Sequence, residues 1–179
     1  EEKGEKLSSD ELIATAILLL NAGHEATVHA FGNGVKTLLE CGVDLADLMH
    51  PAKVENTVEE TLRFDPPLHM FTRFVYEDIE LFGQDFKRGD EIALMLGAAN
   101  RDPVQFTAPN DFQPERAIKG ITSFGAGLHF CIGAPLARLE LHTALPILFE
   151  RCPDLRLNGL AEYADRYHFH GLTGLNLNR

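Results

Sequence analysis

A single cysteine in a glycine-rich segment, directly before an apolar helical pattern, constrains this chain more than any other feature. The segment is SFGAGLHFCIGAPLARLEL, residues 123–141, and Cys131 lies two positions before Gly133. A thiolate is favoured at a helix N-terminus, where backbone amides and the helix dipole stabilise its charge. Glycine removes side chains and lets a flat ligand approach the backbone. With Phe124 and Phe130 as apolar walls, the segment suits a large planar group whose metal takes one axial sulfur.

Two other interpretations of Cys131 stay open on this segment alone. A zinc site is one, but zinc takes three or four protein ligands, and no CxxC or HxxxH pattern lies near Cys131. A plain core residue is the other, because a free cysteine often behaves as a small buried hydrophobe. Taken by itself, the segment favours the core residue.

The composition is that of an ordinary globular domain and argues against several classes of protein. The 179 residues suffice for a domain with a sizeable core, and 45% are hydrophobic and 24% charged. A net charge of −11 argues against a nucleic-acid or anionic-membrane partner. Three widely spaced cysteines favour a reducing compartment, and the apolar run LIATAILLL is too short to span a bilayer. The chain begins with Glu1 rather than Met, which favours a fragment or a processed product.

Hydrophobic periodicity and turn residues predict more helix than strand. Ser8 and Glu11 form a capping box before a long helix that is apolar on nearly every side and is therefore expected to be largely buried. Turn signals at Gly83-Gln84 and Gly89-Asp90 separate short strands. The expected elements are helices over 7–42, 44–49, 51–64 and 134–151, short strands over 68–96, an irregular segment over 97–120, and two or three strands after 155.

Three further motifs precede the cysteine segment. EETLR contains Glu60 and Arg63, whose spacing places both on one helix face, where they can pair. On a solvated surface such a pair contributes little. AGHEAT spans residues 22–27 of the long helix, and FQPER ends at Arg116. Four motifs in this order make a highly specific combination.

In these four motifs the sequence resembles the cytochrome P450 family. FGAGLHFCIG matches the haem-binding signature of that family at every fixed position, EETLR contains its Glu-x-x-Arg pair, AGHEAT resembles its oxygen-activation segment, and FQPER resembles its meander motif. The resemblance is greatest to the soluble bacterial type. It implies that residues 1–179 are one C-terminal haem-binding portion, without the N-terminal half of the family fold. The implied fold is mainly α with small β-sheets, comprising the long central helix, the Glu-x-x-Arg helix, the meander, the cysteine loop and the following helix.

The resemblance also implies a haem b site and a structural network. Cys131 would be the proximal thiolate on the iron, and Arg73 would bind a haem propionate with His129 as a second donor, because the arginine fork suits carboxylates. An ordinary strand-surface arginine is the alternative for Arg73. The other residues expected at the haem are Phe124, Gly125, Gly133, Ala22 and Gly23, and the expected non-catalytic network that anchors the stretch around 109–114 is Glu60, Arg63 and Arg116.

The segment Gly23 to Thr27 departs from the family pattern. The family usually supplies an acid followed directly by a threonine, whose hydroxyl helps to deliver protons for cleavage of the O–O bond. Here the acid is Glu25, but Ala26 follows it, and Thr27 is rotated by about 100° on a regular helix. Either water or the substrate supplies the missing hydroxyl, or oxygen activation is poorly coupled. Equally, Ala26 makes room for a bulky or hydroxylated substrate.

The remaining cysteines and histidines are expected to have lesser roles. Cys41 and Cys152 end helices and are interpreted as inert packing residues. His168 and His170 alternate on an expected strand, but no third metal ligand is evident in the sequence. The other expectations place His69 at a pocket wall or in solvent, His24 near the haem edge, and the tip around Leu172 to Leu175 in the substrate pocket.

The function implied by the resemblance is that of a haem-thiolate monooxygenase, which inserts one oxygen atom from O2 into a small organic substrate. Its electrons would come from a ferredoxin-type redox partner with an NAD(P)H-dependent reductase, in the cytoplasm, with no nucleic-acid or membrane partner. Two alternatives stay open. Ala26 mildly favours a peroxygenase or isomerase, and the missing N-terminal half favours a non-catalytic, even haem-free, fragment.

Overall fold

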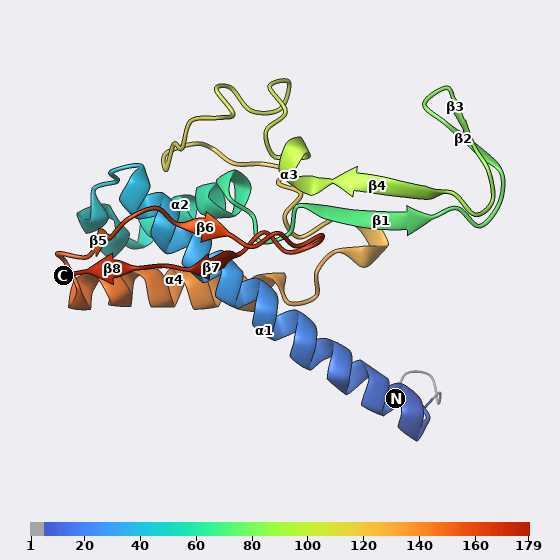
Figure 1. Ribbon diagram of the computed structural model, residues 1–179, viewed down its shortest axis with the longest axis horizontal. Coiled ribbons are helices and arrows are strands. Elements are labelled where there is room, and N and C mark those ends of the chain that lie inside the picture. The colour runs from blue at the N-terminus through green and yellow to red at the C-terminus, as the bar shows by residue number, and fades with distance from the viewer. Residues whose placement is uncertain (1–5) are drawn as a thin grey trace.

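Three helices pack together at the centre of the computed structural model, which describes residues 6–179 (Figure 1). They are α1 (Ser9–Glu40), α2 (Pro51–Phe64) and α4 (Ala134–Arg151), and each contacts the other two. The predicted helices over 51–64 and 134–151 are confirmed. Glu1, on which the expectation of a fragment depends, lies outside the described residues.

Helix α1 starts as predicted, but the expectation that it is largely buried is wrong. Its capping box is formed, with the Glu11 amide donating to Ser8 Oγ over 3.3 Å and the Ser8 amide donating to the Glu11 carboxylate over 2.8 Å. Every residue from 7 to 24 is exposed, and fully buried residues begin at Ala30. The first half projects away from the other described elements, so its apolar side chains have nothing to pack against (Figure 1).

The hydrophobic core lies where the three helices meet. Leu38 of α1, Val58 of α2 and Leu145 of α4 have no accessible surface. Burying one such side chain contributes about 1.5–3 kcal/mol. Helices α1 and α2 approach closely at Gly34, where an added Cβ would lie 3.2 Å from Thr61 Cγ2. The core therefore fixes the second half of α1 against α2 and α4, which carry the motifs.

Between α2 and the cysteine segment, two antiparallel pairs of strands form one long arm (Figure 1). β1 (Met70–Phe74) pairs with β4 (Glu91–Met95), and β2 (Ile79–Leu81) pairs with β3 (Gln84–Phe86) at the tip. The tip turn is Phe82-Gly83, with φ of 54° and 76°, as a two-residue hairpin turn requires.

The remaining elements are short. η1 (Leu45–Met49) precedes α2, α3 (Leu96–Ala99) follows β4 where irregular structure was expected from 97, and η2 (Gly127–His129) lies in the cysteine segment. The tail has four strands rather than two or three, because β5 (Arg156–Leu157) pairs with β8 (Leu177–Asn178) and β6 (Glu162–Tyr163) pairs with β7 (Leu172–Gly174).

The architecture is mainly α with small two-stranded sheets, as predicted. One expectation for the tail is wrong, because His168 and His170 lie between β6 and β7 rather than on a strand. Phe169, between them, forms an isolated bridge with Leu68 and brings this segment beside the start of β1. Within residues 6–179, no helix combines the length and the apolar character that crossing a membrane requires.

Candidate functional site

Glu60 and Arg63 form a fully buried ion pair on α2. Arg63 Nε donates to Glu60 Oε2 over 2.7 Å, and its second terminal nitrogen donates to Oε1 over 2.8 Å. Arg116 Nε reaches the same Oε1 at 3.2 Å, and the Gln113 amide donates to it over 2.8 Å. The three residues expected to form a network are thus in direct contact.

This network holds the irregular segment that follows α3. Arg63 donates to the backbone oxygens of Asn100 and Pro109, each over 2.9 Å, and to that of Asp111 over 3.2 Å. Arg116 donates to the carbonyls of Thr107, Ala108 and Asp111. Guanidinium groups therefore satisfy backbone acceptors that no helix or strand ladder would satisfy.

A second buried link, which sequence reasoning missed, ties this segment to the cysteine loop. Asn100 has no accessible surface, and its Oδ1 accepts the Thr122 amide over 2.7 Å. Its Nδ2 donates to Ser123 Oγ over 2.7 Å, and Ser123 Oγ donates to the Leu62 carbonyl over 2.7 Å. The available signal was the ANRDP stretch, which contains Asn100 between a short helix and the irregular segment.

Cys131 closes a tight loop three residues before the start of α4. Gly125 and Gly127 have φ of 69° and 66°, in the left-handed region that favours glycine. The Cys131 amide donates to the Phe124 carbonyl over 2.9 Å, and its carbonyl accepts the Ala134 amide over 3.2 Å. The thiol is exposed. This exposure removes the core-residue interpretation.

The surface beside the thiol suits a flat apolar ligand. Leu128, Phe130 and Ile132 are 95%, 50% and 87% exposed, and exposed apolar groups gathered in this way mark binding surfaces. An added Cβ at Gly133 would lie 3.8 Å from the Cys131 sulfur. The only group of metal-ligating side chains found in residues 6–179 does not include Cys131. The donor set, a single accessible sulfur, therefore fits an axial ligand to a macrocycle and does not fit a zinc site.

The two expected propionate donors are both exposed. Arg73 lies on β1, and its guanidinium donates to the neighbouring Thr72 carbonyl over 2.9 Å. His129 is the last residue of η2. Phe124 is half-buried, with its ring centroid 6.4 Å from that of Phe130.

Residues 22–27 lie on an unbroken stretch of α1. Ala22 and Gly23 are exposed, and an added Cβ at Gly23 would meet nothing within 4 Å. The Thr27 hydroxyl donates to the Gly23 carbonyl over 3.2 Å, so the helix is not unwound and the hydroxyl is committed to the backbone. Ala26, which precedes Thr27, contributes no polar side-chain group.

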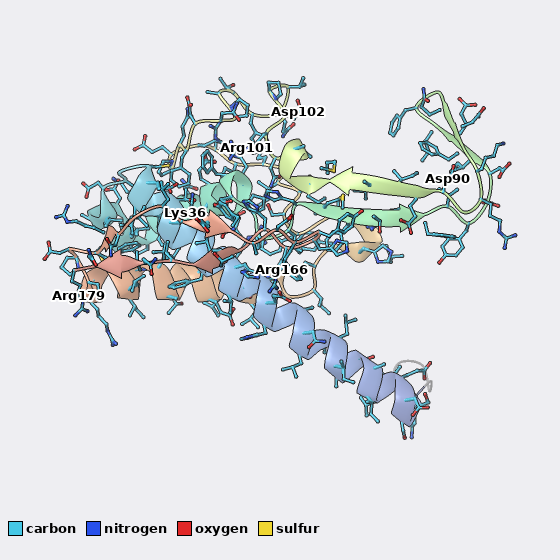
Figure 2. All side chains as sticks on the ribbon, viewed as in Figure 1. Lys36, Asp90, Arg101, Asp102, Arg166 and Arg179 are labelled. Atoms are coloured by element: carbon cyan, nitrogen blue, oxygen red, sulfur yellow. The ribbon has the colours of Figure 1, made fainter. Side chains whose placement is uncertain are left out.

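Glu25, the expected acid, is in an ion pair that the sequence does not predict. Its Oε1 lies 2.8 Å from an Arg166 nitrogen and 3.6 Å from His29 Nε2. Figure 2 shows Arg166 beside the middle of α1, reached from the tail. The side chains of Glu25 and Arg166 are 40% and 59% exposed, so the pair is open to solvent.

Comparison with known proteins agrees with this geometry. The family model for cytochrome P450 matches residues 39–154. The chain belongs to the cytochrome P450 family. It is 43% identical to the cytochrome P450 monooxygenase PikC of Streptomyces venezuelae, over 88% of this chain and 38% of that protein. It is 42% identical to the biotin biosynthesis cytochrome P450 of Bacillus subtilis, over 91% of this chain and 41% of that protein.

Solved cytochrome P450 structures share the fold. P450BioI in complex with a hexadec-9Z-enoic acid-ligated acyl carrier protein superimposes with a TM-score of 0.91 at 40% identity, over 98% of this chain and 46% of that one. The bacillaene polyketide synthase cytochrome P450 PksS of Bacillus subtilis gives 0.93 at 38% identity, over 99% and 47%. The predicted fold class is confirmed. The chain spans about two fifths of the curated relatives it matches and about half of the solved ones.

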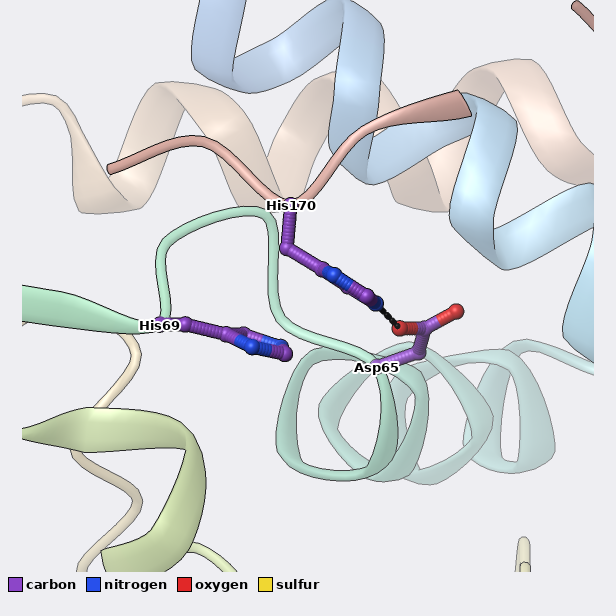
Figure 3. A group of neighbouring side chains, drawn as sticks. All are labelled: Asp65, His69 and His170. Atoms are coloured by element: carbon purple, nitrogen blue, oxygen red, sulfur yellow. Dashed lines mark ion pairs between the residues drawn. The ribbon is translucent and has the colours of Figure 1, made fainter. Parts of the chain in front are cut away.

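Two other clusters escaped sequence reasoning. Arg138 of α4 forms a two-point ion pair with Glu59 of α2 and lies 4.5 Å from the Phe124 ring centre. Arg138 is the last residue of the PLAR stretch that ends the cysteine motif, but its pairing with Glu59 could not be inferred from sequence spacing. Asp65, His69 and His170 meet at the end of α2, where His170 gains the partners that the sequence alone did not reveal (Figure 3).

The other cysteines lie at helix ends. Cys41 follows α1 and is exposed, so its interpretation as a packing residue is wrong. Partial desolvation of the thiol, with the charge of Glu40, raises its pKa. Cys152 follows α4, is half-buried against the core, and accepts a hydrogen bond from Arg179 over 2.6 Å. His24 is exposed on α1, and His168 lies with Nδ1 3.4 Å from the Met70 carbonyl.

Proposed function

We propose that residues 1–179 form the C-terminal haem-binding portion of a haem-thiolate monooxygenase that inserts one oxygen atom from O2 into a small organic substrate. The observation that carries this proposal is the exposed Cys131 thiol on its glycine-shaped loop, beside exposed apolar side chains, in a chain of the cytochrome P450 family. PikC, a relative, is named a monooxygenase.

In this proposal Cys131 would hold haem b through its sulfur. When bound, the haem supplies the binding and reductive activation of O2, which a thiolate ligand favours by donating electron density. Arg73 and His129 are both exposed and provide donors for the propionate carboxylates. The residues that leave space or apolar surface for the ring are Phe124, Gly125, Gly133, Ala22 and Gly23.

Glu25 is the proposed source of protons near the reacting oxygen. It carries the only carboxylate in the AGHEAT segment, and the Arg166 pair keeps that carboxylate at a solvent-open position. Ala26 has no hydroxyl, and the Thr27 hydroxyl is bonded to the Gly23 carbonyl. Either a water molecule or a substrate hydroxyl takes the place of the missing side-chain hydroxyl, or oxygen activation is poorly coupled.

The proposed electron donor is a ferredoxin-type protein with an NAD(P)H-dependent reductase, and the proposed location is the cytoplasm. These assignments rest on the resemblance to soluble bacterial cytochrome P450s. The net charge of −11 supports the expectation that neither nucleic acid nor an anionic membrane is a partner.

A peroxygenase is the second candidate, and Ala26 with the committed Thr27 hydroxyl favours it. Hydrogen peroxide already carries the two electrons and two protons that O2 has to gain, so an enzyme that uses it does not need a side-chain hydroxyl to deliver protons to O2. An isomerase, or a haem-binding fragment without activity, would also keep the Cys131 loop.

One set of measurements on the purified protein separates these functions. Haem content and the absorption of the reduced carbon-monoxide complex test the thiolate site. Turnover with NADH, ferredoxin and reductase is then compared with turnover with hydrogen peroxide alone. A red-shifted carbon-monoxide band with NADH-driven product supports the monooxygenase, whereas peroxide-driven product alone supports the peroxygenase. Absence of haem binding overturns the proposal.

A further inference from the structure

Asp65, His69 and His170 bring three potential metal ligands together from separate parts of the chain (Figure 3). Asp65 follows the last residue of α2, His69 precedes β1, and His170 lies in the tail between β6 and β7. One ligand atom from each lies within 4.8 Å of the other two. This group is called the Asp65 cluster, and it does not include Cys131.

The spacing of the first two ligands already suits a metal ion. His170 Nε2 lies 3.2 Å from Asp65 Oδ1. Two bonds of about 2.0–2.1 Å at a tetrahedral angle place ligand atoms about 3.3 Å apart. Two histidines, one carboxylate and an open fourth position match the donor sets of zinc sites that keep a bound water.

The backbone holds both histidines in place. The His170 amide donates to the Pro67 carbonyl over 2.8 Å, and its carbonyl accepts Asn33 Nδ2 over 2.8 Å. The His69 carbonyl accepts the Gly97 amide over 3.1 Å. Such anchoring lowers the ordering cost that a metal site has to overcome.

The Tyr163 hydroxyl orients the Asp65 carboxylate. It donates to Oδ2, which leaves Oδ1 toward His170. An imidazole binds a metal in its neutral form, so both histidines have to be unprotonated in the metal-bound state.

The ring of His69 has to change its orientation when a metal binds. The rings of His69 and His170 stack with centroids 3.8 Å apart and planes at 18°. Face-to-face rings cannot both direct an in-plane lone pair at one ion, so the His69 ring has to turn. A cavity of about 260 Å³ lies beside it, lined in part by Gly97 and Arg101, and gives it room.

The charge of Arg101 opposes a cation in this cavity, but the guanidinium is held at the wall. It donates to the Phe64 carbonyl over 2.7 Å and to Asn110 Oδ1 over 3.1 Å, and it lies 4.2 Å from the Phe64 ring centre. The Asp65 carboxylate offsets its charge. We propose that the Asp65 cluster binds one divalent transition-metal ion of the zinc type through Asp65, His69 and His170, and so ties the tail to the end of α2.

Titration with Co²⁺ tests the site, since its absorption spectrum distinguishes nitrogen and oxygen ligands from thiolates and so excludes the three cysteines without mutating them. We expect one Co²⁺ per chain, no thiolate-to-cobalt charge-transfer band, and displacement by Zn²⁺. His69→Gln and His170→Gln should each weaken binding at least about tenfold, because even loss of an outer-shell partner costs 10–100-fold. Tyr163→Phe should weaken it by about tenfold or more.

His168→Gln is the matched control, because His168 lies in the same tail segment but outside the cluster. It should bind Co²⁺ as the unchanged chain does. Circular dichroism of each variant shows whether a loss of binding reflects a loss of fold. The proposal is overturned if the unchanged chain binds no Co²⁺, if thiolate bands dominate, or if folded His69→Gln and His170→Gln bind as tightly as the unchanged chain.

Discussion

Arg63 and Glu60 pair through two hydrogen bonds of 2.7 and 2.8 Å with neither side chain accessible to solvent. The pair stands at the end of α2, from which Arg63 also reaches three backbone carbonyls of the following irregular segment. Burial without these partners would be strongly unfavourable for either charge. The pair therefore contributes both to the stability of the fold and to the position of the segment that leads to the cysteine loop.

Removal of Arg63 should destabilise the protein severely. Arg63→Ala leaves the Glu60 carboxylate buried and unbalanced, and breaking a buried pair in this way costs about 3–5 kcal/mol. Domains of this size have free energies of unfolding of about 5–15 kcal/mol, so the variant should lose a large part of its stability. Urea unfolding followed by circular dichroism measures the loss.

Lys87→Ala is the matched control for that variant. Lys87 Nζ pairs with Asp78 at 2.9 Å, but the two side chains are 69% and 61% exposed. Exposed pairs contribute about 0–1 kcal/mol, so the midpoint of unfolding should hardly change. Equal losses in the two variants would show that burial of the Arg63 pair has no energetic importance.

Asn100 should control how well the cysteine loop is formed. Asn100→Ala leaves the Thr122 amide and Ser123 hydroxyl without their buried partner, at a cost of about 1–3 kcal/mol. Because these residues begin the loop that carries Cys131, haem retention should fall more than helix content. Parallel haem titration and circular dichroism test this, and normal haem affinity in a destabilised variant would contradict it.

Cys131→Ser should abolish the red-shifted Soret band of the reduced carbon-monoxide complex in the complete enzyme. A serine oxygen does not replace the electron donation of a thiolate. Cys41→Ser is the control, because Cys41 lies after α1 and outside the loop. A normal band in Cys131→Ser would move the ligand assignment to another residue.

The sequence predicts those features of the fold and the site that depend on residues close together in the chain, and it does not predict contacts between distant segments. The capping box at Ser8 and the pairing of Glu60 with Arg63 are set by spacings of three residues, and both were predictable. The exposure of Leu20 was not, because periodicity gives the apolar faces of a helix and not what lies against them. The Asp65 cluster joins segments separated by up to about a hundred residues through the Leu68–Phe169 bridge, which no local pattern encodes.

Ala26→Thr separates two hypotheses for proton delivery in the complete enzyme. If the absent hydroxyl limits delivery, the change should raise the coupling of NADH consumption to product. If the native substrate supplies the hydroxyl, the added side chain should crowd it and lower turnover. Glu25→Gln should slow oxygen activation in either case, because it removes the acid and keeps the shape. An unchanged rate for Glu25→Gln would remove the role proposed for Glu25.

The lowered pKa of His69 predicts that acid weakens the fold. Burial and the neighbouring His170 lower this pKa below the ordinary histidine value of about 6.5 in the folded protein. As the pH falls through 6.5, the unfolded chain takes up a proton that the folded chain does not, so the free energy of unfolding decreases until the folded pKa is passed. Urea midpoints between pH 8 and pH 5 should therefore fall less in His69→Gln than in the unchanged chain, while His168→Gln should keep the original dependence. Identical pH dependence in His69→Gln and the unchanged chain would show that His69 does not resist protonation in the folded state.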